Sequence, residues 1–400
     1  MIANALARRN GGGAAVIVTL PVTAGGSDAF IVKYNTSGLA QWATTVPGTT
    51  GDIGYAIATD STGVYVTGYY NASSVITLNN DKTLPITIGF TDAFIVKYNT
   101  SGLAQWSTTI RTFPAAPGYG ITTDSTGVYV TGQYNSSGVV TLNNGITLPA
   151  TAGGGTNDAF IVKYNTSGLA QWSTTIRGIT DDRGFAIRTD STSVYVTGQY
   201  TSSEVVTLNN GITLPVSAGG TDAFIVKYNT SGLAQWATTV AGTGNDRGLG
   251  IATDSTGVYV SGSYISSGVV TLNNGITLPP SNAGLIDAFI VKYNTSGLAQ
   301  WSATIQGTLT DDGFAIATDS TDVYVTGQYR SSGVVTLNNG ITLPVPLNND
   351  AFIVKYNTSG LAQWATTIRG TLDDIGYGIT TDSTGVYVTG QYRSSGIVTL

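Results

Sequence analysis

The sequence predicts an all-β protein, a six-bladed β-propeller built from four-stranded blades. Three observations carry this prediction. The first two are that one unit recurs six times along the chain and that each unit contains four short strands bounded by turn residues. The third is the composition of the 400 residues, with Gly 52, Tyr 22, 41% hydrophobic and only 10% charged residues. Such a chain has ample material for a core and few of the residues that exposed helices favour, which excludes an all-α protein and a disordered one.

The repeated unit is marked by the string DAFIVKYNTSGLAQW. Successive copies start 63 to 66 residues apart, at Asp28, Asp92, Asp158, Asp222, Asp287 and Asp350. The six tryptophans share one place in the string and are Trp42, Trp106, Trp172, Trp236, Trp301 and Trp364. Because a large ring at the same place in every copy can fill the space between two copies, we expect these side chains to pack between blades.

Two hairpins are predicted in each unit. In the first copy, Ala29–Tyr34 and Leu39–Val46 flank a turn, Asn35–Gly38, that ends in a glycine suited to positive φ. Tyr55–Thr59 and Val64–Tyr69 form the second hairpin. Runs such as FIV and VYV are apolar at consecutive positions, which indicates sheets covered on both faces. No helical period separates the strands, so neighbouring blades rather than helices are expected to cover them.

The turn of the second hairpin is DSTG, residues 60–63, in which the Asp side chain caps the turn and the glycine is expected at positive φ. Two copies carry Ser193 and Asp322 at the glycine position. Asp adopts the left-handed region more readily than Ser does, so the turn at Ser193 is expected to be the more strained.

An additional segment follows the second hairpin. In VVTLNNGITLP, residues 139–149, an Asn-Asn-Gly turn separates two β-branched runs, which predicts an extra β-hairpin projecting from each blade. Residues 396–400 (GIVTL) match its first arm and residues 16–21 (VIVTLP) match its second arm. The N- and C-terminal segments are therefore predicted to share one blade and to close the ring. Residues 16–400 would form a single propeller domain after a flexible Gly-rich tail, 1–15; the alternative is an open array or a fragment of a larger propeller.

Composition and charge exclude several classes of protein. The chain has no Cys and no His, which removes disulfides, zinc sites with those ligands, Ser-His-Asp triads and Cys nucleophiles. A net charge of -6, with no basic cluster beyond Arg8 and Arg9, argues against nucleic acid as a partner. No apolar run approaches the ~20 residues needed to span a bilayer, so membrane insertion is not expected. No signal peptide is visible, because the two arginines follow the first apolar stretch instead of preceding it.

The DAFIVKYN strand, the Trp-bearing strand, the GYAIATD strand and the VYVTG strand together resemble the repeats of the bacterial β-propeller family called SBBP. The resemblance extends from about Val16 to Leu400 and recurs in all six units. It implies a propeller fold and an extracellular or surface location. Members of that family are generally inferred to have seven blades, whereas this sequence has six units.

Acidic residues in the loops after the Trp-bearing strands are the first candidates for a ligand site. They are Asp52, Asp181, Asp182, Asp246, Asp311, Asp312, Asp373 and Asp374, whereas the second loop carries PAAP, residues 114–117. In a closed ring these loops gather at the channel mouth, where carboxylate oxygens could bind Ca²⁺ or a cationic ligand. Tight turns before Gly favour the same Asp residues, and no calcium-loop motif is present, so no cofactor is predicted.

A tyrosine after each VTG or VSG string provides the second candidate site. The group comprises Tyr70, Tyr134, Tyr200, Tyr264, Tyr329 and Tyr392. Each precedes a polar loop, an arrangement that suits stacking on a glycan, and packing between blades is the alternative.

The predicted function is a non-enzymatic, rigid binding or structural module, favoured to lie at a cell or particle surface, whose similar units bind a repeated ligand with avidity. The expected ligand is a glycan or a protein. One alternative is a metal-dependent hydrolase or lyase that uses the acidic loops, although Glu204 is the only glutamate and nothing marks a carboxylate pair. The other is self-assembly by strand addition through the projecting hairpins.

Overall fold

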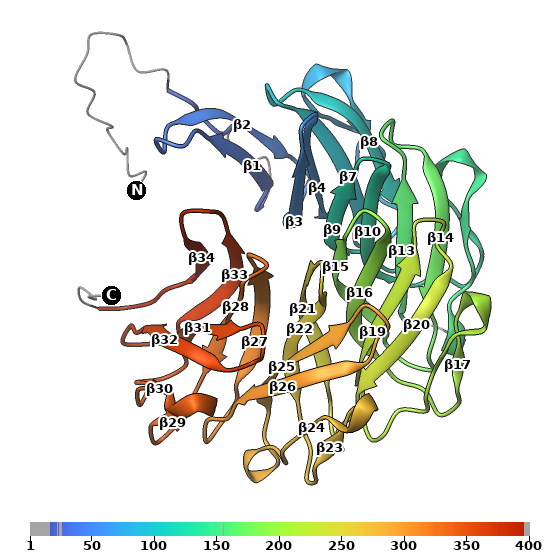
Figure 1. Cartoon of the computed structure of the whole chain (residues 1–400). Coiled ribbons are helices and arrows are strands. Elements are labelled where there is room, and N and C mark those ends of the chain that lie inside the picture. The colour runs from blue at the N-terminus through green and yellow to red at the C-terminus, as the bar shows by residue number, and fades with distance from the viewer. Residues whose placement is uncertain (1–16, 22, 24–25, 155, 396–400) are drawn as a thin grey trace.

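The computed structural model describes residues 17–21, 23, 26–154 and 156–395. Within these ranges the chain is a series of antiparallel sheets arranged around a central axis, with seven short 3-10 segments as its helices (Figure 1). None of these helices is long and apolar enough to span a membrane. The all-β prediction is confirmed, whereas the predicted tail, 1–15, and the C-terminal arm, 396–400, lie outside the described residues.

Five sheets have four strands each and form complete blades. The first contains β3 (Ile53–Asp60), β4 (Gly63–Tyr70), β7 (Asp92–Asn99) and β8 (Ala104–Ile110). The second contains β9 (Gly118–Asp124), β10 (Gly127–Tyr134), β13 (Asp158–Tyr164) and β14 (Ala170–Ile176). The third contains β15 (Arg183–Thr189), β16 (Ser193–Tyr200), β19 (Asp222–Asn229) and β20 (Ala234–Val240). The fourth and fifth contain β21 (Arg247–Asp254), β22 (Gly257–Tyr264), β25 (Asp287–Asn294) and β26 (Ala299–Ile305), then β27 (Asp312–Thr318), β28 (Asp322–Tyr329), β31 (Asp350–Asn357) and β32 (Ala362–Ile368).

Each complete blade joins the second hairpin of one unit to the first hairpin of the next. In the second blade, for example, Val130 of β10 lies opposite Val162 of β13. The inner strands β3, β9, β15, β21, β27 and β33 (Ile375–Thr381) lie side by side around the axis. Every residue of β10 is buried, as the run of consecutive apolar residues predicted. The core consists of apolar layers between blades: Tyr129 and Ile161 of one blade pack with Val196 of the next.

Two half-blades stand at the ends of the arc. The hairpin of β1 (Ala29–Tyr34) and β2 (Ala40–Val46) is one two-stranded sheet, and that of β33 and β34 (Val386–Gln391) is another. Figure 1 shows them on either side of an opening in the arc. They hold the two complementary halves of a blade but are not joined into one sheet, so neither a sixth complete blade nor ring closure is confirmed.

The extra hairpins are present but do not project. Each has two-residue strands around an Asn-rich 3-10 turn: β5 (Ile76–Thr77), η1 (Asn79–Asp81) and β6 (Thr83–Leu84); β11 (Val140–Thr141), η2 (Asn143–Gly145) and β12 (Thr147–Leu148); β17 (Val206–Thr207), η4 (Asn209–Gly211) and β18 (Thr213–Leu214); β23 (Val270–Thr271), η5 (Asn273–Gly275) and β24 (Thr277–Leu278); β29 (Val335–Thr336), η7 (Asn338–Gly340) and β30 (Thr342–Leu343). Two further 3-10 segments, η3 (Ala152–Gly154) and η6 (Asn282–Gly284), lie before β13 and β25.

The hairpin folds back onto the outer strand of its own blade. The Asn143 side chain accepts a hydrogen bond from Ala170 N at 2.7 Å and donates one to Gly168 O at 2.8 Å. Leu148 of the hairpin is fully buried. The prediction of projecting arms is wrong, because amide side chains and apolar packing hold the hairpin against the blade edge.

Glycine serves a different purpose in the two kinds of turn. In the first hairpin Gly102 has φ +81, as predicted. In the second hairpin Gly127 is required by close approach, because a Cβ there would lie 2.2 Å from Tyr164 O of the adjacent strand. In the two turns that carry Ser193 and Asp322 in place of this glycine, the positive φ occurs two residues earlier, at Ser191 and Ser320, each with φ 73°. The strain was therefore predicted at the wrong residue of the turn.

Candidate functional site

The buried aspartates of the acidic loops hold their own loops together. Asp182 Oδ1 accepts a hydrogen bond from Thr201 N at 2.9 Å, and its Oδ2 accepts one from Gly178 N. The same pair of backbone contacts is made by Asp52, Asp246, Asp311 and Asp374. All five carboxyl groups are buried, so these Asp residues bridge two loops and offer no surface to a ligand.

Burial also raises the pKa of four of these carboxyl groups. It raises the pKa of Asp182 and of Asp311 to about 8, that of Asp246 to about 7 and that of Asp52 to about 6. A second buried carboxyl group, such as Asp158 beside Asp182, raises the pKa further by like-charge repulsion. A carboxyl group that keeps its proton near neutral pH is a poor cation ligand.

The remaining loop aspartates have separate partners. Asp181 accepts hydrogen bonds from Asn157, Asp312 accepts one from Gln328 Nε2 at 2.8 Å, and the exposed Asp373 accepts one from Asn349 N at 3.3 Å. No three acidic side chains come together to hold an ion anywhere in the described ranges. The predicted use of these loops for Ca²⁺ or hydrolysis therefore lacks a cluster of carboxylate ligands there.

Five of the six candidate tyrosines are in the interior. Tyr70, Tyr134, Tyr200, Tyr264 and Tyr329 are fully buried, and each hydroxyl donates to a prolyl carbonyl of the extra hairpin at 2.7 to 2.9 Å. A ring covered in this way cannot stack on a glycan. Tyr392, in the half-blade, is exposed.

The tryptophans lie at the contact between adjacent blades. Trp106 Nε1 donates to Thr166 O of the next blade at 3.0 Å, and a Cβ at Gly168 would lie 2.6 Å from the Trp106 ring. The same contacts recur at Trp42, Trp172, Trp236 and Trp301. Trp364, whose blade is followed by a half-blade and not by a complete one, is 39% exposed.

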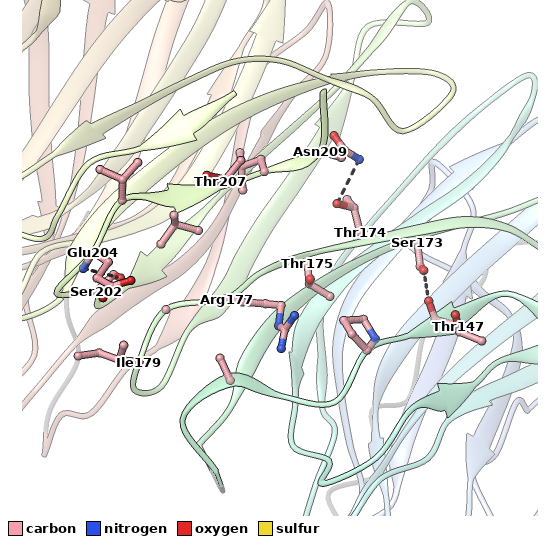
Figure 2. A pocket seen from close by; sticks show the side chains of 16 residues that line it. Thr147, Ser173, Thr174, Thr175, Arg177, Ile179, Ser202, Glu204, Thr207 and Asn209 are labelled. Atoms are coloured by element: carbon pink, nitrogen blue, oxygen red, sulfur yellow. Dashed lines mark hydrogen bonds between the residues drawn. The ribbon is translucent and has the colours of Figure 1, made fainter. Parts of the chain in front are cut away.

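A polar groove of about 590 Å³ runs between the outer strand of the second blade and the extra hairpin of the third. Figure 2 shows Arg177 and Glu204 among the hydroxyl side chains that line it. Arg177 Nε contacts the buried Asp158 at 3.2 Å, so its charge is already compensated. Glu204 is the only carboxylate in the groove lining, which therefore has no acid-base pair of the kind used in glycoside hydrolysis.

An exposed aromatic pair distinguishes the first complete blade. Phe90 and Phe113 are 69% and 65% exposed, and their rings stack with centroids 6.2 Å apart. Phe90 N donates to Pro114 O at 2.7 Å, which ties the two loops together, and the exposed Ile88 lies in the same loop as Phe90. We call Ile88, Phe90 and Phe113 the aromatic patch. The PAAP departure in the sequence marked this loop, but no sequence argument singled out the two phenylalanines.

The comparisons with known proteins agree with a propeller but do not assign a family. The chain matches no family profile. It is 28% identical over 411 aligned residues to an uncharacterized WD repeat-containing protein of Acanthamoeba polyphaga mimivirus, an alignment that covers 86% of this chain and 30% of that protein. The chain thus spans less than a third of the length of this relative.

These findings overturn the resemblance to the SBBP family, because no profile of that family matches and the relative found is a WD repeat-containing protein. The repeats share a strand pattern that any propeller with four-stranded blades must satisfy, which explains why sequence motifs alone suggested the wrong family. What stands is a repeat protein of the β-propeller type, with four-stranded antiparallel blades.

Proposed function

We propose that this chain is a non-enzymatic, six-bladed propeller scaffold that binds a protein partner through the aromatic patch. The observation that carries the proposal is the exposure of two stacked phenylalanine rings in the one repeat whose loops depart from the others. Exposed aromatic side chains clustered on a folded surface are typical of protein interfaces, where such rings supply much of the binding energy.

Several features favour a scaffold over an enzyme. The chain has no His or Cys, and the buried Asp residues of the loops are occupied by backbone N–H donors. The similarity to a WD repeat-containing protein, although distant, points in the same direction.

A protein ligand is favoured over a glycan. The tyrosines available for stacking in the complete blades are buried, whereas the aromatic patch is apolar and offers few hydrogen-bonding groups for sugar hydroxyls. The patch also belongs to one blade only, so it would bind one partner rather than a repeated polymer.

The test is the double substitution Phe90→Ser with Phe113→Ser. The unsubstituted chain is immobilised on beads and cross-linked chemically in an extract of the source organism. This bait should recover one discrete partner protein. Affinity for the purified partner should fall at least about tenfold in the double variant, as expected for loss of a hot spot. Val139→Ser with Val205→Ser is the matched control, because both valines are exposed, apolar and located on extra hairpins away from the patch.

Equal binding by the double variant and the control would refute the aromatic patch as the contact. Binding of the natural sequence to a glycan array, unaffected by the phenylalanine substitutions, would favour the glycan alternative. Circular dichroism of both variants checks that folding is unchanged.

A further inference from the structure

Each inner strand carries a β-bulge at the same place. In β15, Gly184 lies opposite Gly198 and Ala186 opposite Thr197, so Phe185 is the extra residue that has no partner on β16. A bulge turns its extra side chain out of the regular alternation of the strand. The six bulged residues are aromatic or apolar and are Tyr55, Tyr119, Phe185, Leu249, Phe314 and Tyr377.

The bulged side chains meet one another from blade to blade. Ring centroids are 5.2 Å apart for Tyr55 and Tyr119, and 5.7 Å apart for Tyr119 and Phe185. The rings of Phe314 and Tyr377 are also 5.7 Å apart. Each pair joins neighbouring inner strands, which lie side by side around the axis (Figure 1). We call the six bulged residues the collar; none of them is fully buried, so the collar offers apolar surface near the axis.

Arg188 lies three residues beyond Phe185 on the same inner strand. The equivalent residues of the other copies are all small and are Ala58, Thr122, Ala252, Ala317 and Thr380. Arg188 is exposed, whereas Ile187 before it is buried. β16 occupies one edge of β15, and β10 and β21 of the adjacent blades cover its two faces. The exposed side chain therefore extends toward the axis, the direction that these strands leave open.

The guanidinium of Arg188 has no counter-charge within the described ranges. No ion pair there includes it, and no hydrogen-bond partner there accepts from it. By contrast, Arg177 and Arg369 contact Asp158 and Asp350 at 3.2 and 3.0 Å. The surrounding protein desolvates Arg188 and lowers the pKa of its guanidinium, which still keeps its charge at neutral pH. A desolvated charge without a partner costs free energy that an anionic ligand would recover.

We propose that Arg188 is the binding residue of an oxyanion site on the axis, which takes the carboxylate or phosphate of a ligand whose ring contacts the collar. A guanidinium binds either group through two parallel N–H donors. Phe185 and Arg188 are separated by about 10 Å along the strand, and the Arg side chain covers much of that distance, so a small aromatic acid can reach both. The site goes beyond the proposed function, because it uses none of the residues of the aromatic patch.

Titration calorimetry at constant ionic strength tests the proposal. The probes are phenylacetate and phenyl phosphate, which carry the two anions on a ring, and acetate and inorganic phosphate, which lack the ring. The natural sequence should bind the ring-bearing probes more tightly than the ring-free ones, and the tighter of the two ring-bearing probes identifies the preferred anion. Arg188→Ala should weaken this binding at least about tenfold, as expected for loss of a charged hydrogen-bond donor. Ala is the natural residue at Ala58, Ala252 and Ala317, so the variant is expected to fold.

Two further variants separate the charge from the collar. Arg330→Ala removes the same charge from an exposed residue after β28, away from the inner strands, and should leave the affinity unchanged. Phe185→Leu introduces the residue that the fourth copy carries as Leu249. It should weaken binding of the ring-bearing probes by about threefold or more, as expected for loss of an aromatic contact, without affecting acetate or inorganic phosphate.

Equal affinity of Arg188→Ala and the natural sequence for the ring-bearing probes would overturn the site, and so would absence of binding at millimolar probe concentrations. A second readout is the Tm without any probe. Arg188→Ala should be at least as stable as the natural sequence, because it removes an unpaired charge, and a clear loss of stability would show that Arg188 serves the fold instead. The variant with Phe90→Ser and Phe113→Ser should bind the probes normally, so failure of this site and failure of the proposed function can be told apart.

Discussion

The five complete blades and the two half-blades are built from nearly the same sequence but differ in what they bury. Phe224 in the third blade is fully enclosed, whereas Phe30, in the same DAFIVKYN string, is mostly exposed. The difference arises because half of each complete blade comes from the next unit, and five of the six Trp side chains contact a glycine of the following blade. A single unit therefore cannot bury its own apolar residues, and stability depends on neighbours.

The largest expected effect is that of pH, because buried carboxyl groups with a raised pKa occur in several loops between complete blades. The pKa values of Asp182, Asp246 and Asp311 are raised from the ordinary 3.8 to about 7 or 8, chiefly by burial. The folded chain then binds more protons than the unfolded chain between about pH 4 and pH 8, so the free energy of unfolding falls as pH rises through that window. We expect Tm to drop by about 5–10 °C between pH 5 and pH 8, measured by calorimetry.

Asp222→Asn provides the control for the pH effect. Asp222 repels Asp246, and its Oδ1 is buried without a hydrogen-bond partner, so a neutral amide at this position removes the repulsion. The variant should lose less stability than the natural sequence between pH 6 and pH 8. A natural chain that is equally stable at pH 5 and pH 8 would contradict the assignment.

Truncating the equivalent phenylalanines tests whether the half-blades stay different in solution. Phe224→Ala should cost about 3–5 kcal/mol in urea unfolding, because it leaves a cavity in a packed layer. If the β1–β2 hairpin docks on β34, Phe30→Ala should approach that value. A cost of about 0.5 kcal/mol or less for Phe30→Ala, as expected for a surface substitution, would show that the propeller ring is not closed at this strand.

The architecture was predictable because it depends on local pattern and repetition. Six copies of DAFIVKYN, five of which lie inside complete blades, fix the strands, the four-stranded blades and the pairing of one unit with the next. The direction of the extra hairpin was not predictable, because the Asn143 side chain finds its partners at Gly168 and Ala170, more than 20 residues away.

The candidate site was predicted less well, for the same reason. Tyr134 precedes a polar loop and was expected to be available to a ligand, yet Pro149 of the folded-back hairpin accepts its hydroxyl hydrogen bond and the ring is buried. Phe90 and Phe113 lie outside the repeated strings, where a pattern gives no expectation. Counted from the shared Asp and Trp, Leu285 stands at the position of Phe90 in another copy and Ile179 at that of Phe113, so a comparison of the six units would have marked only the aromatic character of the pair.

Glycine substitutions at the tryptophan contact offer a smaller, more local test. Gly232→Ala places a Cβ at φ +81 and 2.6 Å from the Trp172 ring, so strain and overlap together should cost about 2–3 kcal/mol. Gly38→Ala has φ +75 but an open neighbourhood, and should cost about 1 kcal/mol in an open arc. If the β1–β2 turn packs under Trp364, as ring closure would require, the two variants should lose equal stability, measured as changes in the urea midpoint. A persistent difference between them would contradict this packing.

The smallest expected effect concerns the asparagines that join an extra hairpin to the preceding blade. Asn143 Nδ2 donates to Thr108 Oγ1 of the preceding blade at 3.0 Å, besides its two bonds to the outer strand. Asn338 keeps the two bonds to its own outer strand, but Ala303 stands where the threonine would be. Asn143→Ala should therefore destabilise the chain by about 0.5–1 kcal/mol more than Asn338→Ala, the net worth of one hydrogen bond. Calorimetry of the two variants measures this difference, and equal losses would mean that the bond between blades contributes nothing and that the apolar layers alone hold neighbouring blades together.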